Sequence, residues 1–302
     1  MRKEFAQRIE KLAVENEKIV FLTGDLGFMA LENIKNAIGE RFINVGVSEQ
    51  NMISVAASLA YEGLSPICYS IAPFIVFRPA EQIRLDVCLH NLNVKIVGNG
   101  GGFGYGIMGA THHAIEDIAV LSSFQHMRCY IPFCNEDVEG VVDRMFSYNG
   151  PSYLRLGFGV KPGEMVIPPA LPIRKVCEGS KITIIGLGPV LLNAYEALKN
   201  FEKNTADVFV VSEVPVLEFS EELQESIRKT KKLIIIEEHV KRGGLGEHIA
   251  SLLMEKGISC EFIHMYVTGY VNGLYGNQVY HVEENGMDHV SIGAKIKALI
   301  TA

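Results

Sequence analysis

The chain has 302 residues, of which 48% are hydrophobic and 21% charged, and its formal net charge is -7 at pH 7. This composition is typical of a folded globular protein with two ordinary domains, and it excludes a disordered chain. The mild acidity and the lack of a basic run argue against nucleic-acid binding. No apolar run reaches membrane-spanning length, and the N-terminus leads into an amphipathic helix, so we expect a cytoplasmic protein without membrane association.

The six cysteines are scattered along the chain and form no C-x-x-C pair. Cysteines with such spacing are more often buried, reduced thiols than ligands of a metal site or members of a disulfide framework. We therefore expect no metal ion to be bound by this chain itself.

The first half of the chain alternates between predicted strands and helices. Short apolar runs typical of buried parallel strands occur at 19–22, 42–45, 66–71, 94–97, 128–131 and 152–156. Segments with helical spacing of apolar residues occur near 5–13, 32–38, 48–61, 79–90, 115–124 and 138–146. This alternation predicts an α/β domain in which helices cover both faces of a parallel sheet.

A linker is predicted at residues 159–178, which are rich in glycine and proline and show no periodicity. It separates a first domain of residues 1–158 from a second, smaller α/β domain of residues 179–302. In the second domain we expect strands at 181–185, 208–211, 233–236 and 261–264, and helices that end near 200 or cover 220–227, 245–254 and 292–300.

The stretch Gly-Val-Ser-Glu-Gln-Asn at 46–51 joins a predicted strand to a predicted helix through a glycine turn. Ser48 is placed to cap the helix. Glu49 falls in the first helical turn, at the end of the sheet where open parallel sheets bind ligands. A carboxylate in this position is commonly only a partner of the helix dipole, so its assignment depends on other features of the chain.

A glycine-rich stretch at 98–113 contains a G-x-G-x-x-G pattern at Gly104, Gly106 and Gly109, which raises the possibility of a dinucleotide site. The context disfavours that site, because the pattern runs into Thr-His-His rather than a helix and lacks the later acidic residue that contacts the ribose. Two interpretations remain open: backbone folded closely around a ligand with an imidazole presented to it, or a flexible surface loop with two solvated histidines.

Phe74 and Phe77 follow the third predicted strand, and their spacing places both rings on one side of a helical turn. Two phenylalanines near a strand end usually belong to the core. Here, however, Glu49, the phenylalanine pair and His112 follow three successive strands of one predicted sheet. Ligand sites in open α/β sheets are assembled from such strand ends, so we expect these side chains to meet.

The order of these motifs resembles the pyrimidine-binding domain of transketolase and deoxyxylulose-phosphate synthase. The matching features are the Gly-Val-Ser-Glu-Gln-Asn stretch, the F-x-x-F pair, the G-x-x-G-x-T-H pattern at 106–112 and Pro-Ser-Tyr-Leu-Arg at 151–155. Glu-Glu-His at 237–239 and Gly-Gly-Leu-Gly at 243–246 are similar to the transketolase C-terminal domain. The resemblance implies a parallel-sheet, thiamine-diphosphate-binding pyrimidine domain followed by a smaller transketolase C-terminal-like α/β domain.

The resemblance also shows what this chain lacks. Single-chain family members carry a preceding domain with a Gly-Asp-Gly motif and a later asparagine that hold Mg²⁺ and the cofactor diphosphate, and Gly-Asp-Leu-Gly at 24–27 does not match that motif. This implies the C-terminal half of a split transketolase. It would act with a separate N-terminal subunit that binds Mg²⁺, and it would self-associate in an α2β2 heterotetramer.

The resemblance assigns cofactor contacts to particular residues. Glu49 matches the carboxyl group that bonds N1′ of the aminopyrimidine and stabilises the tautomer needed to remove the C2 proton of thiamine. Phe74 and Phe77 match rings that pack on the pyrimidine. Asp25 and Gln50 are expected at the cofactor as well.

His112 matches a family histidine that hydrogen-bonds the donor sugar, which implies proton transfer or oxyanion stabilisation. The implied reaction moves a two-carbon ketol unit from a ketose to an aldehyde, with the cofactor performing the bond chemistry. Glu49 and His112 are therefore the expected catalytic residues, and small sugars the expected substrates.

Three departures from the family pattern concern the substrate. Gly100 stands where sugar-phosphate transketolases have a histidine for the acceptor phosphate, Met108 replaces an aspartate that reads donor hydroxyls, and Phe158 replaces a phosphate-binding arginine. We therefore expect either an acceptor other than an ordinary pentose phosphate or an anion bound elsewhere. Arg78 and Arg155 are the candidates to bind that anion.

Two other classes of function remain open. The same two-domain layout occurs in the β subunit of 2-oxo-acid dehydrogenases and in decarboxylating enzymes like deoxyxylulose-phosphate synthase. A regulatory or scaffolding relative without catalysis is the third possibility, although Glu49 and His112 are both retained.

Overall fold

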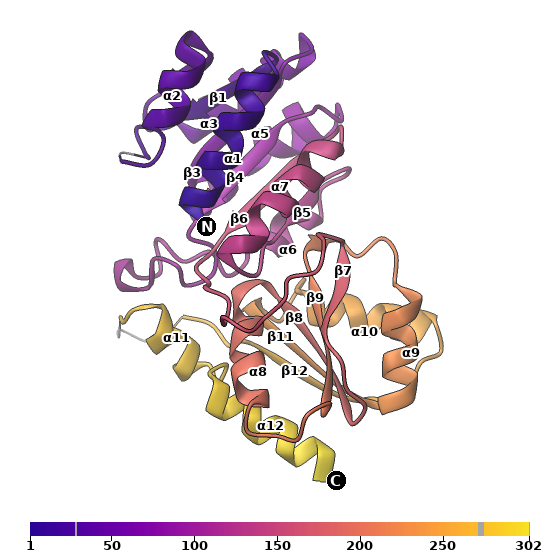
Figure 1. Ribbon diagram of the computed structural model, residues 1–302. Coiled ribbons are helices and arrows are strands. Elements are labelled where there is room, and N and C mark those ends of the chain that lie inside the picture. The colour runs from indigo at the N-terminus through magenta and orange to yellow at the C-terminus, as the bar shows by residue number, and fades with distance from the viewer. Residues whose placement is uncertain (28, 271–274, 302) are drawn as a thin grey trace.

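The computed structural model describes residues 1–27, 29–270 and 275–301. Figure 1 shows two α/β domains, with the first (indigo to magenta) packed end to end on the second (orange to yellow). The last residue of the expected second domain and residues 271–274 lie outside the described residues. None of the described helices is long and apolar enough to cross a bilayer.

The first domain is built on a sheet with the strand order β10-β5-β6-β4-β3-β1-β2. Its strands are β1 (Ile19–Thr23), β2 (Phe42–Asn44), β3 (Ser65–Ile71), β4 (Lys95–Asn99), β5 (Arg128–Tyr130), β6 (Ser152–Leu156) and β10 (Glu213–Val214). All pairs except β10 with β5 are parallel. The carboxyl ends of β1 to β4 therefore meet at one edge of the sheet, where the candidate residues follow.

The helices of the first domain are α1 (Arg2–Glu15), α2 (Glu32–Ile38), α3 (Glu49–Tyr61), α4 (Ala72–Phe77), α5 (Ala80–Gln82), α6 (Asp117–Ser122) and α7 (Val138–Ser147). Short 3-10 turns occur at η1 (Gly39–Arg41), η3 (Gly106–Met108) and η4 (Asn135–Asp137), and η2 (Ile83–Cys88) is a π-helical turn. The helix expected at 79–90 is thus a short α-helical turn continued by η2. Ser48 stands at the N-cap of α3 as expected, but its side chain accepts no capping hydrogen bond from the described residues.

The second domain has a sheet with the strand order β12-β11-β8-β9-β7. Its strands are β7 (Ile173–Cys177), β8 (Ile182–Leu187), β9 (Ala206–Val211), β11 (Lys232–Val240) and β12 (Glu261–Val267). Its helices are α8 (Leu191–Leu198), α9 (Glu221–Thr230), α10 (Leu245–Glu255), α11 (Gln278–Glu284) and α12 (His289–Thr301), with the 3-10 turn η5 (Gly188–Val190) before α8.

Strand β7 lies inside the predicted linker, so the sheet of the second domain begins earlier than residue 179. This strand is at the edge of the sheet, pairs antiparallel with β9 and is only partly buried. Edge strands do not carry the continuous apolar run of a central parallel strand, which is why the pattern did not reveal it.

The two domains are joined by more than the connecting chain. Strand β10 comes from the second half of the sequence, but it pairs with β5 of the first sheet. Glu213 of this strand also forms an ion pair with Arg144 of α7. The buried guanidinium of Arg174 lies 2.5 Å from Asp137 of η4. The domain boundary is therefore a packed and hydrogen-bonded interface.

Candidate active site

Glu49 is the first residue of α3, and a turn at Gly46 (φ +73°) leads the chain from β2 into this helix. The residue is only 3% exposed. Ser70 Oγ, near the end of β3, donates to Glu49 Oε1 at 3.0 Å, and Arg78 Nη1 donates to Glu49 Oε2 at 2.8 Å. A buried carboxylate requires such partners, because it has lost its hydrating water.

Arg78 and Phe74 form the wall beside this carboxylate. The guanidinium carbon of Arg78 lies 3.8 Å from the centroid of the Phe74 ring, in a cation–π arrangement. The Arg78 side chain is 44% exposed, whereas Phe74 is half-buried. Phe77, one turn along α4, is exposed. An aromatic surface therefore lies next to Glu49, with Arg78 resting on it.

His112 reaches the same place from the loop after β4. The centroid of its imidazole ring lies 5.0 Å from that of Phe74, edge to face, and 6.1 Å from that of Tyr105. Thr111 Oγ1 is 2.9 Å from His112 Nδ1. The structure thus brings together four of the expected site residues, Glu49, Phe74, Arg78 and His112, at the carboxyl edge of the first sheet.

Asp25 and Gln50, which were also expected at the cofactor, have exposed side chains. Asp25 is exposed, and its backbone N–H donates to Asn44 Oδ1 at 3.0 Å. It lines a separate hollow of about 350 Å³ that also includes Lys35. The side chain of Gln50 is exposed to solvent. A ligand would have to extend beyond the Glu49 cluster to contact Asp25.

Arg155 is buried at the domain boundary. Its Nε lies 3.2 Å from Asp117 Oδ2, and its Nη2 donates to the carbonyl oxygens of Ala114 and Glu238 at 2.8 and 2.9 Å. With only 5% of its surface exposed, the guanidinium is already engaged by the protein. This geometry favours a structural role over the binding of a substrate anion, for which Arg155 was a candidate.

The glycine-rich stretch is closely packed. Gly102 and Ala114 exchange two backbone hydrogen bonds of 2.9 Å, which close the loop at its base. A Cβ placed on Gly102 (φ +62°) would lie 2.4 Å from the carboxylate of Glu238, and one on Gly106 would lie 2.6 Å from the Asn277 backbone. The glycines therefore allow close backbone contact, which favours the close-folded interpretation over a flexible loop.

The paired histidines have different environments. His112 is half-buried beside Phe74, whereas His113 is 2% exposed and its Nε2 lies 3.0 Å from the carbonyl oxygen of Gly106. Burial lowers the pKa of His113, and the neighbouring His281 ring adds to this effect. Only His112 is placed to meet a ligand of the Glu49 cluster.

Two site features could not have been assigned from sequence. Ser70 is fully buried and bonds Glu49, and the only signal for it is a hydroxyl within an otherwise apolar strand run. Arg78 was expected to bind a substrate anion, but here it is paired with Glu49. Both contacts depend on how α3 packs against β3 and the end of α4, which the sequence pattern does not specify.

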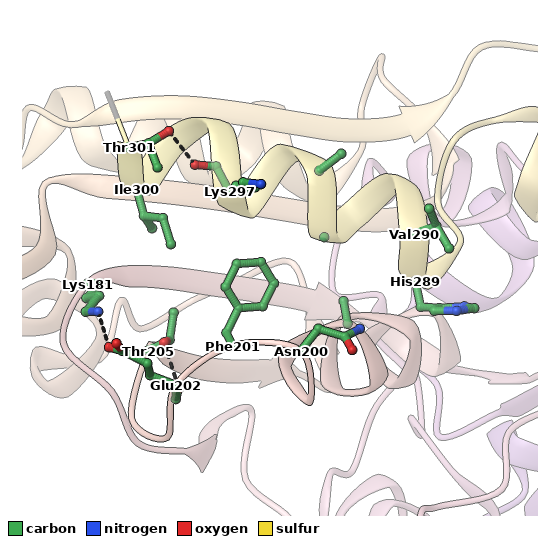
Figure 2. Close-up of a pocket in the computed structure, with 13 residues that line it drawn as sticks. Lys181, Asn200, Phe201, Glu202, Thr205, His289, Val290, Lys297, Ile300 and Thr301 are labelled. Carbon is green, nitrogen blue, oxygen red and sulfur yellow. Dashed lines mark hydrogen bonds and ion pairs between the residues drawn. The ribbon is translucent and has the colours of Figure 1, made fainter.

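A second hollow of about 650 Å³ lies entirely within the second domain, between α12 and the turn after α8 (Figure 2). Its walls include Phe201 and Ile300, and its Lys181 is paired with Glu202 at 2.5 Å. None of the expected catalytic residues lines it. The candidate active site therefore remains the cluster around Glu49.

Comparison with known proteins identifies the family of both domains. Residues 1–157 match the family model described as transketolase, pyrimidine binding domain, and residues 172–271 match transketolase, C-terminal domain. The chain belongs to the transketolase family. The predicted family and the predicted fold class, a pyrimidine-binding domain followed by a C-terminal-like α/β domain, are confirmed. The chain is therefore part of a thiamine-diphosphate-dependent, transketolase-type transferase.

Similar proteins include transketolase chains and related enzymes. The chain is 30% identical over 285 residues to a subunit of the apulose-4-phosphate transketolase of Phocaeicola vulgatus, covering 90% of this chain and 89% of that protein. It is 29% identical to 1-deoxy-D-xylulose-5-phosphate synthase of Clostridium perfringens, covering 84% of this chain but 42% of that enzyme. A solved structure titled "Split gene transketolase, inactive beta4 tetramer" has a TM-score of 0.85 and 30% identity, covering 99% of this chain and 97% of that one.

Proposed function

We propose that this chain supplies the pyrimidine-binding half of a two-chain transketolase. The enzyme would transfer a two-carbon ketol unit from a ketose to an aldehyde, and a separate N-terminal subunit would hold Mg²⁺ and the cofactor diphosphate, in an α2β2 assembly. The observation that carries the proposal is the buried Glu49 carboxylate beside Phe74, with the His112 ring 5.0 Å from that phenylalanine. The relatives named as a transketolase subunit and as a split-gene transketolase support a divided enzyme.

The site fits the aminopyrimidine of thiamine diphosphate. That ring needs a carboxylate at its N1′ nitrogen and an aromatic surface on its face. In this structure the planar guanidinium of Arg78 occupies the place that the pyrimidine would take, because it donates to Glu49 and stacks on Phe74. Since the Arg78 side chain is 44% exposed, it can turn outward and leave both surfaces to the pyrimidine.

When bound, thiamine diphosphate supplies the nucleophilic carbon that accepts the two-carbon unit. Glu49 would hold the N1′ nitrogen, and Phe74 and Phe77 would flank the ring. His112 would exchange a proton with, or donate a hydrogen bond to, an oxygen of the donor sugar. Arg78, once released from Glu49, would lie at the edge of the site and bind an anionic group of the substrate.

We infer that the substrate differs from an ordinary pentose phosphate. The positions of three family sugar contacts hold Gly100, Met108 and Phe158, and the last two side chains are exposed. At Gly100 a Cβ would lie 2.3 Å from the Tyr105 ring, so a histidine cannot enter without displacing that ring. The name of the Phocaeicola vulgatus relative makes apulose 4-phosphate a donor to test.

The test is reconstitution of the chain with the N-terminal subunit that co-purifies with it. Ketol transfer that requires thiamine diphosphate, Mg²⁺ and both chains is the expected result. Assays would compare apulose 4-phosphate with the pair xylulose 5-phosphate and ribose 5-phosphate. Full turnover of the ordinary pentose phosphates would refute the substrate inference, and cofactor-independent behaviour of the complex would refute the function.

A second candidate function is decarboxylating transfer, as in deoxyxylulose-phosphate synthase. The 29% identity to the Clostridium perfringens enzyme favours this reaction over a purely structural role. Release of carbon dioxide from pyruvate by the reconstituted complex would select this function. A non-catalytic subunit would instead bind its partner normally, and Glu49→Ala would not change the activity of the complex.

A further inference from the structure

The second domain forms one wall of the glycine-rich loop that carries His112. Helix α11 contacts the 3-10 turn η3 at the loop tip, and Figure 1 shows α11 at the boundary of the two domains. A Cβ on Gly109 would lie 2.5 Å from the ring of Tyr275, and one on Gly106 would meet the backbone just before α11. The glycine-rich loop and the segment that leads into α11 are therefore in direct contact.

Glu238 is the polar contact at the centre of this wall. It lies near the end of β11 and is 5% exposed. Its Oε1 accepts a hydrogen bond of 2.5 Å from the backbone N–H of Phe103. Gln278 of α11 donates to both carboxylate oxygens, at 3.2 and 3.0 Å. Burial raises the pKa of Glu238.

A continuous set of contacts leads from Glu238 to His112. The ring of Phe103, whose N–H is bonded to Glu238, packs edge-on against His113 with centroids 5.0 Å apart. His113 Nε2 in turn bonds the carbonyl of Gly106 at 3.0 Å. His112 is thus the neighbour of a residue that is fixed on both sides, so its backbone position depends on where Phe103 is held.

We propose that Glu238 is a positioning residue of the active site, which acts across the domain boundary by fixing the loop that presents His112. The catalytic part of this proposal rests on the proposed role of His112. The structural part does not, because it concerns only the order of the loop in this chain.

The alternative is that Glu238 merely helps to hold the domains together. The structure offers a matched control for that role. The buried pair of Arg174 and Asp137 also joins the domains, at 2.5 Å, but neither residue belongs to the loop or its wall. Arg174→Met therefore weakens the boundary without removing a loop contact.

The first experiment measures amide hydrogen exchange of residues 101–113 in the isolated chain. In Glu238→Ala, exchange of this segment should accelerate about tenfold or more, because the bond to the Phe103 N–H is lost and the loop opens locally. Glu238→Gln retains an acceptor oxygen and should stay within about threefold of the wild type. Arg174→Met should leave segment 101–113 unchanged even if it lowers the melting temperature.

The second experiment uses the reconstituted enzyme. Glu238→Ala should lower kcat while the Kd of thiamine diphosphate stays unchanged, because the Glu238 side chain is hydrogen-bonded to Phe103 and Gln278 and not to Glu49 or Phe74. Glu238→Gln should restore most of kcat. A loss of cofactor affinity in parallel with kcat would instead indicate general damage to the site and would overturn the proposal.

Each outcome decides the question. If Glu238→Ala and Arg174→Met change exchange in the same segments, Glu238 is only a domain contact and the proposal is wrong. If Glu238→Ala does not fold, Gln278→Ala removes the two donors that orient the carboxylate, and exchange at 101–113 should still rise. If Glu238→Ala accelerates amide exchange at 101–113 but leaves kcat unchanged, the proposed role of His112 is refuted. If Glu238→Ala leaves amide exchange at 101–113 unchanged, the proposed role of Glu238 is refuted.

Discussion

Two buried glutamates of this chain have contrasting partners. Glu49 is bonded by Ser70 and by Arg78, whose side chain is 44% exposed, so one of its partners can be exchanged for a ligand. Glu238 is bonded by the Phe103 backbone and by Gln278 within the domain boundary, so its partners are part of the fold. The difference suggests that a buried carboxylate can bind a ligand where its charged partner reaches solvent. Where all its partners are buried in the protein, the carboxylate stabilises the fold.

The largest effect is expected for Glu49→Gln in the reconstituted enzyme. Loss of the carboxylate that tunes the pyrimidine should lower kcat about a hundredfold or more, the range of an acid–base contribution. Binding of the partner subunit, measured by sedimentation, should not change. A kcat within about threefold of the wild type would mean that Glu49, like Glu238, has a structural role and does not bind the cofactor.

His112→Ala should produce the next largest effect. Removing the imidazole should reduce kcat by about a hundredfold, because the donor sugar loses a proton-transfer or oxyanion partner. Cofactor affinity should remain, since His112 contacts Phe74 only by its edge. Titration of thiamine diphosphate beside steady-state kinetics separates these effects, and a parallel loss of cofactor binding would contradict the assigned role.

Arg78→Met sharpens the comparison, because it removes the exchangeable partner of Glu49. A half-exposed ion pair stabilises by up to about 1 kcal/mol, so the Kd of thiamine diphosphate should fall by up to about fivefold. The KM of a phosphorylated sugar should rise at the same time. A higher Kd of thiamine diphosphate would show that Arg78 helps to bind the cofactor and does not compete with it for Glu49.

The smallest effect concerns pH. The pKa of His113 lies below 6.5 in the folded chain because of its burial, so the unfolded chain binds the proton first as pH falls. The free energy of unfolding should therefore decrease as pH falls below 6.5. His113→Gln should flatten that decrease in urea titrations. If the free energy of unfolding of His113→Gln falls with pH as steeply as that of the wild type, His113 is exposed to solvent, as it would be in a flexible loop.

The architecture could be predicted largely because most strands are central and parallel. Runs such as Ile19–Thr23 and Ile182–Leu187 are buried along their whole length and are therefore mostly apolar in sequence. The two-residue strand β10 is too short to carry any pattern, and β7 lies at an edge. Helix α11 was also missed, since its buried residues His281 and Val282 are adjacent and give no helical repeat.

The candidate site could be predicted in part. Glu49, Phe74 and His112 follow successive strands of one parallel sheet, so their approach to one another follows from topology. The pairing of Arg78 with Glu49 and the burial of Arg155 depend on side-chain packing between elements, which no local pattern encodes. The contact of Glu238 with the loop joins residues 135 positions apart, beyond any periodicity.

The most direct test of the central claim is the affinity of the reconstituted complex for thiamine diphosphate. With the wild-type chain we expect saturable binding that needs both subunits. With Glu49→Ala we expect a Kd raised about tenfold or more, because a hydrogen bond to a buried charged group is lost. Equal affinity of the two complexes would contradict the claim that Glu49 holds the pyrimidine.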